Sequence, residues 1–135
     1  MVRADVARRK IAAAEAHLRD AEALFDRPRE EFVGDKKTHD LAAFYVFLAI
    51  QEPIDLAAHW IADAGWGPPD DVPSVFAVLA ERGVITAELA SSLHSAASLC
   101  NRIGHGYATL DHGRLYEEFR EGADTVRRFL RAAAI

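Results

Sequence analysis

The polar residues best suited to chemistry stand close together near position 100. Asn101, Arg102 and His105 fall within about two turns of one predicted helix. An imidazole, with a reference pKa of about 6.5, can accept or donate a proton near neutral pH, and a guanidinium can stabilise charge on a phosphate. The segment from Asn101 to Asp111 is therefore the candidate functional site.

These residues lie on the polar side of the helix predicted to follow Thr86. At 100° per residue, one stripe is apolar and a second is polar. The apolar stripe contains Leu89, Leu93, Ala96, Cys100, Ile103 and Tyr107, and the polar stripe contains His94, Ser98, Asn101 and His105. A polar stripe is often only a solvated face. However, Gly104 and Gly106 each cost a helix about 1 kcal/mol relative to alanine. Their presence favours close approach of a backbone or ligand, the alternative being that the helix simply ends here.

Apolar spacing at alternating steps of three and four predicts the helices that position this segment. The first helix should run over Ala4–Phe25, and the second from an N-cap at Thr38 to Ala64. Pro53 should bend this second helix near Ala49. Three more helices are expected from Pro73 to about Arg82, from Thr86 through His105, and from about Asp111 onward. Pro28 should end the first helix, and a polar connector should lead to Thr38. No β-type alternation is found, so we predict an all-α, four- to five-helix up-and-down bundle.

Composition limits the functions that fit this chain. It has 135 residues, 50% of them hydrophobic, which suits one domain over residues 1–135. The single cysteine and an N-terminus without an apolar leader predict a cytoplasmic location, and the apolar run at 41–50 is too short to span a membrane. A net charge of -5 argues against broad affinity for nucleic acid, so any contact with nucleic acid must be local. No metal-ligand motif is present, so neither a metal nor another cofactor is expected.

The segment Cys100-Asn101-Arg102-Ile103-Gly104-His105-Gly106-Tyr107 resembles the motif of HepT-like HEPN proteins, in which Arg-Asn opens a run that ends in His-x-Tyr. The order of RKIAAAEAHL, LAIQEPIDLAAHWI, GPPDDVPSVFAVLAERGVI and the last helix is also similar to that family, so the resemblance spans almost the whole chain. It implies a bundle that dimerises side by side, a metal-independent ribonuclease toxin, and an antitoxin partner that is a minimal nucleotidyltransferase of the MNT type. It also implies that the partner transfers AMP to Tyr107.

One motif position departs from the family, because Cys100 stands where the family has arginine. If Arg102 takes over the missing charge, the chain is an endoribonuclease with His105 as acid/base, Asn101 as orienting group and RNA bound in a composite cleft between two copies. If it does not, the chain is a catalytically weak or silent module that binds its nucleotidyltransferase partner or RNA. A purely structural dimer is a third possibility. We predict a homodimer, because Cys100, Ile103 and Tyr107 exceed what short helices need internally.

Overall fold

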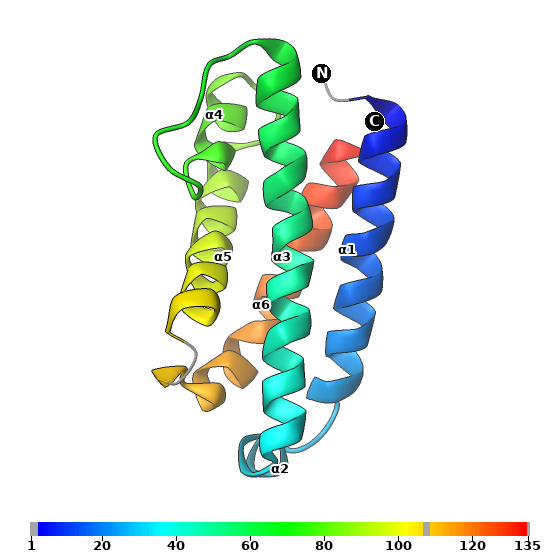
Figure 1. Cartoon of the computed structure of the whole chain (residues 1–135), viewed down its shortest axis with the longest axis vertical. Coiled ribbons are helices and arrows are strands. Elements are labelled where there is room, and N and C mark those ends of the chain that lie inside the picture. The colour runs from blue at the N-terminus through cyan, green and yellow to red at the C-terminus, as the bar shows by residue number, and fades with distance from the viewer. Residues whose placement is uncertain (1–2, 107–108, 135) are drawn as a thin grey trace.

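The chain folds as a bundle of helices, shown in Figure 1 as a computed structural model that describes residues 3–106 and 109–134. The helices are α1 (Ala4–Phe25), α2 (Arg29–Gly34), α3 (Lys36–Ala64), α4 (Val75–Glu81), α5 (Ala87–His105) and α6 (His112–Ala133). No strand occurs in the described ranges. The all-α prediction is confirmed. Four long helices and the short helix α4 match the five helices predicted from the sequence, and α2 is additional.

The central element is α3, which packs against all five other helices. Its apolar residues point in several directions, and eleven of its residues are buried. By length and composition α3 could cross a membrane, but half of its most apolar stretch is covered by the bundle. This is the behaviour of a core helix. The helix continues through Pro53, as predicted, without a break.

Two sequence-based boundaries around α3 were wrong. We expected a polar connector up to Thr38, but α2 forms inside it, because Phe32 is fully buried and stacks on Phe25 with ring centroids 4.6 Å apart. We also expected Thr38 to cap the helix. The cap is Asp35 instead, whose carboxylate accepts hydrogen bonds from the Thr38 amide and hydroxyl at 3.3 and 2.8 Å. Those hydrogen bonds also hold the pKa of Asp35 below its usual range.

The other predicted boundaries are close to those observed. The α3 helix ends at Gly65, which adopts a left-handed φ of 71°. The third long helix, α5, begins after Thr86, whose hydroxyl accepts from the Leu89 amide at 3.1 Å. Asp111 caps α6 by accepting from the Arg114 amide at 3.0 Å. These caps fix where the two helices that build the candidate site begin.

Candidate functional site

The predicted apolar stripe of α5 is the buried face of that helix. Leu89, Leu93, Ala96, Cys100 and Ile103 are at most 9% exposed. Asn101, Arg102 and His105 are exposed on another side, as the helix geometry predicts. Tyr107 lies outside the residues that the structure describes. The argument for a dimer from the apolar stripe is wrong for Cys100 and Ile103, because the protomer's own core covers both side chains.

A pocket of about 430 Å³ opens where α5 ends and α6 begins. Asn101, Arg102 and His105 line it from α5, so the structure brings all three predicted site residues to one pocket. The connection to α6 contributes Gly106 and Thr109–Asp111, and α6 contributes Arg114, Leu115 and Glu118. A second hollow of about 630 Å³ continues from it along the seam between α5 and α6. The two together form a groove open to solvent.

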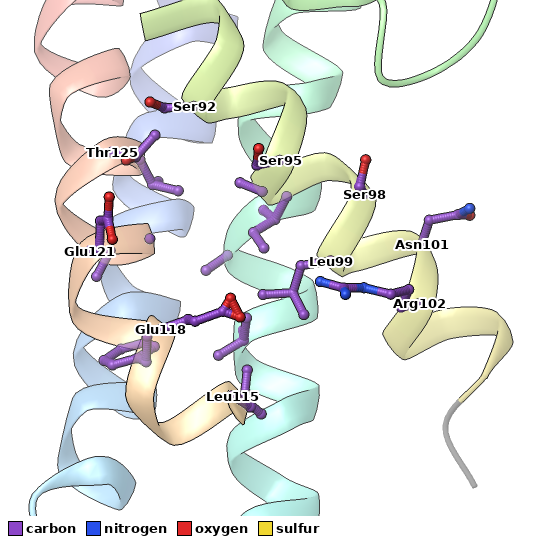
Figure 2. A pocket seen from close by; sticks show the side chains of 18 of the residues that line it. Ser92, Ser95, Ser98, Leu99, Asn101, Arg102, Leu115, Glu118, Glu121 and Thr125 are labelled. Carbon is purple, nitrogen blue, oxygen red and sulfur yellow. The ribbon is translucent and has the colours of Figure 1, made fainter. Parts of the chain in front are cut away.

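Figure 2 shows how the polar groups lie along this groove. Arg102 extends from α5 back toward Leu99, whereas Asn101 points away from the groove. Ser92, Ser95 and Ser98 add hydroxyl groups along α5, and Glu118 reaches in from α6. Within the described residues, Arg102 makes no ion pair or side-chain hydrogen bond, so its guanidinium is available to an anionic ligand. The hydroxyl and guanidinium groups suit a ligand with phosphate oxygens.

Arg114 is a pocket residue that the sequence argument missed. Its Nε lies 2.7 Å from a carboxylate oxygen of Glu118, one turn along α6, and its side chain is 61% exposed. The predicted start of α6 near Asp111 already put Arg114 in the first turn of that helix. The sequence could not show that this turn faces the end of α5. The pocket thus contains two arginines, one from each helix, beside His105.

The connection between the two helices is closed by short hydrogen bonds. The Gly106 amide donates to the Arg102 carbonyl at 2.8 Å, and the Thr109 amide and hydroxyl both donate to the Gly106 carbonyl at 3.0 Å. A Cβ atom at Gly106 would lie 3.3 Å from the Arg102 carbonyl oxygen. The glycine therefore lets the chain turn tightly just after His105.

Gly104 has a packing explanation. A Cβ atom built there would lie 3.2 Å from Cε1 of Phe47 on α3. The expected close approach is therefore to an aromatic side chain of the core and not to a ligand. This contact also brings the exposed end of α5 against α3.

Cys100 points into the bundle and contributes nothing to the pocket. The Gln51 amide of α3 donates to Cys100 Sγ at 3.1 Å, and the thiol lies 3.7 Å from the Phe47 carbonyl oxygen. Burial raises the pKa of the Cys100 thiol, only partly offset by the Gln51 hydrogen bond. The thiol stays protonated at neutral pH. Position 100 therefore supplies neither a cation nor a thiolate to the groove.

Proteins with a similar sequence or fold were found by comparison with known families and solved structures. A family model described as "Ribonuclease HepT-like" matches residues 14–133. No curated protein sequence matches the chain. Similar solved structures include a toxin–antitoxin complex with AMP-PNP, at 20% identity over 95% of this chain and 96% of that one, with a TM-score of 0.88. They also include the tri-AMPylated Shewanella oneidensis HEPN toxin in complex with MNT antitoxin, at 20% identity, the same coverage and a TM-score of 0.87.

A further solved structure with the same fold is YutE of Bacillus subtilis, described as a cytosolic protein of unknown function. It shares 18% identity over 93% of this chain and 87% of that one, with a TM-score of 0.70. At these identities the structural likeness shows the fold. The match to the family model spans most of the chain and shows that the chain is related to this family.

Proposed function

Because this chain belongs to the HepT-like ribonuclease family, we propose that it is the toxin of a toxin–antitoxin pair and cleaves RNA without a metal ion. The observation that carries the proposal is the pocket lined by His105 and by two arginines, Arg102 and Arg114, from different helices. A base and a cation are the two requirements of metal-free phosphodiester cleavage, and His105 and Arg102, which is unpaired within the described residues, are the groups that fit them.

In the proposed reaction, His105 accepts the proton of the RNA 2′-hydroxyl. The 2′-oxygen forms a bond to phosphorus, the bond from phosphorus to the 5′-oxygen breaks, and the departing oxygen takes a proton from an imidazolium. The products are a 2′,3′-cyclic phosphate and a 5′-hydroxyl. Arg102 stabilises the charge on the phosphorane, with Arg114 as a second cation, and Asn101 orients the imidazole or binds phosphate.

The first test is cleavage of transfer RNA and messenger RNA by the purified protein in EDTA. We expect cleavage of at least one of them, with loss on His105→Ala. His94→Ala is a matched control, because His94 is exposed on the same helix but does not line the pocket. Equal activity of the wild type and His105→Ala would contradict the mechanism.

The burial of Cys100 supports a second candidate, a module with weak or no cleavage that binds its nucleotidyltransferase partner or RNA. On this alternative, the family's arginine is missing and nothing replaces it. It predicts that the wild-type protein binds RNA or the partner without cleaving RNA, and that Arg102→Ala changes binding alone. Filter binding beside the cleavage assay separates the two functions.

We further propose that the antitoxin is an MNT-type nucleotidyltransferase that neutralises the toxin by modifying Tyr107. The tyrosine oxygen would attack the α-phosphorus of ATP, forming a phosphodiester and releasing pyrophosphate. The added phosphate would stand two residues from His105 and compete with RNA phosphate by charge. Mass spectrometry after co-expression with the partner should locate AMP on Tyr107. Modification of another tyrosine with Tyr107 untouched would refute the assignment.

A homodimer in the cytoplasm completes the proposal, with RNA bound in a cleft shared by two copies. Leu41 and Phe44, one turn apart on α3, are 43% and 52% exposed and supply an apolar surface for a second copy. Light scattering should give about twice the chain mass of 14.9 kDa. Phe44→Ser should shift the protein toward the monomer and reduce cleavage. A wild-type monomer at micromolar concentration would rule out the shared cleft.

A further inference from the structure

A second polar cluster lies outside the pocket, at the end of the bundle where α3 and α6 begin (Figure 1). It consists of His39 and Asp40 from α3 and His112 from α6. The Asp40 Oδ1 atom lies 2.9 Å from His39 Nδ1 and 3.8 Å from His112 Nε2. The two imidazole rings meet edge to face with their centroids 3.7 Å apart. One potential ligand atom from each residue lies within 4.8 Å of the other two.

The spacing of these atoms suits a small tetrahedral cation. Zinc binds imidazole nitrogen and carboxylate oxygen at about 2.0–2.1 Å, which puts neighbouring tetrahedral ligand atoms about 3.3 Å apart. The observed distances of 2.9 and 3.8 Å fall on either side of that value. Oδ1 of Asp40 thus stands near ligand spacing from both imidazoles, and the ligand atoms of the two histidines lie within 4.8 Å of each other.

The orientation of His112 also fits a metal ligand. Its Nδ1 lies 3.2 Å from the Leu110 carbonyl oxygen, to which a protonated Nδ1 donates. That hydrogen bond places the ring proton on Nδ1, and Nε2 is the nitrogen that faces Asp40. A backbone carbonyl holding the second nitrogen of an imidazole is the usual support of a metal-bound histidine.

The cluster is sheltered and its charge is distributed asymmetrically. The side chains of His39, Asp40 and His112 are only 14%, 27% and 15% exposed. Lys36 pairs with Oδ2 of Asp40, so the other carboxylate oxygen, Oδ1, is the one presented to the imidazoles. The carboxylate can thus keep its lysine while its second oxygen binds a cation.

We propose that His39, Asp40 and His112 form a binding site for a zinc-like divalent transition-metal ion, with water as the fourth ligand. This departs from the expectation of no metal, which considered only motifs close in sequence. The ion would tie the start of α3 to the start of α6. It would also restrain Leu110 and Asp111, which line the His105 pocket. None of the three ligands lines that pocket, so the proposed role of the ion is structural.

The test is titration of the untagged, EDTA-treated and dialysed full chain with Zn²⁺ by calorimetry. We expect one ion per chain and a rise in Tm of roughly 5–10 °C at free Zn²⁺ about 100 times the Kd. Co²⁺ should give the intense visible absorption of a four-coordinate site with nitrogen and oxygen ligands. Absence of Zn²⁺ binding by the wild-type chain would overturn the proposal without any variant.

Variants then locate the ion. Asp40→Asn and His112→Asn should each weaken Zn²⁺ binding by roughly 100-fold or more and abolish the Tm rise. His59→Asn is the matched control, because His59 is an exposed histidine on α3 outside the cluster. Circular dichroism checks that each variant is folded. Wild-type affinity in folded His112→Asn, or loss of binding in His59→Asn, would refute the site.

Discussion

Replacing Cys100 with arginine tests which cation serves the pocket. The family motif has arginine at this position, so restoring it would be expected to raise activity if the side chain could reach the pocket. In this chain position 100 is 2% exposed and faces Gln51 and the Phe47 carbonyl of α3. A buried arginine without a carboxylate partner costs about 3–5 kcal/mol. Total stabilities of such domains are about 5–15 kcal/mol, so the variant should lose much of its stability.

We expect cleavage to depend on Arg102 and not on an arginine at position 100, where the family motif has one. Arg102→Ala should reduce cleavage by about 10²–10³, the usual worth of one transition-state donor, with little change in stability because Arg102 is exposed. Cys100→Arg should not raise cleavage. Cys100→Ser controls for loss of the thiol, since serine is close to cysteine in size and also carries a donor and acceptor group.

The assays are initial rates of RNA cleavage in EDTA and urea unfolding of each variant. A folded Cys100→Arg that cleaves faster than the wild type, beside an Arg102→Ala that cleaves equally well, would refute this reasoning. It would show that an arginine at position 100 can reach the pocket despite the burial of the native side chain.

Three further predictions concern stability. Glu22→Gln should cost up to about 1 kcal/mol at neutral pH, because two hydrogen bonds from Arg127 at 2.6 and 2.9 Å hold the pKa of Glu22 below its ordinary value in a partly exposed pair. A carboxyl group whose pKa is lowered in the folded state stabilises the fold at pH values above its pKa in the unfolded chain, and this stabilisation is lost as the pH falls. In urea unfolding, the stabilities of the wild type and the variant should therefore converge from about pH 5 to about pH 3. Thr86→Ala should cost about 1 kcal/mol in the same measurement by removing the cap on Leu89, and an unchanged stability would contradict the assigned cap. Phe32→Ala should cost about 3–5 kcal/mol, and a loss below about 1 kcal/mol would show that α2 contributes little to the core.

Much of the bundle follows from sequence, because helix periodicity and capping are local effects. The apolar spacing from Ala4 to Phe25, the cap at Thr86 and the predicted helix start near Asp111 identify three of the long helices. The same periodicity puts Asn101 and His105 opposite the buried stripe of α5. A helical angle depends only on residue number, so these predictions needed no knowledge of neighbouring helices.

The sequence pattern predicted helix boundaries less well where tertiary contacts determine them. The connector after Pro28 reads as polar, yet burial of Phe32 against Phe25 makes part of it α2. Thr38 and Asp35 are both capping types, and the side-chain geometry selects Asp35. Competing local choices of nearly equal energy are settled by the packing of the segment as a whole.

Only the tertiary structure shows which residues from different helices meet in each site. Periodicity states which side of α5 is polar, but the arrival of Arg114 beside His105 depends on how α6 packs against α5. Likewise, His39 and His112 are far apart in sequence and meet only because α3 and α6 begin at the same end of the bundle. Sequence determines the faces of each helix, and the packing of helices determines which faces meet.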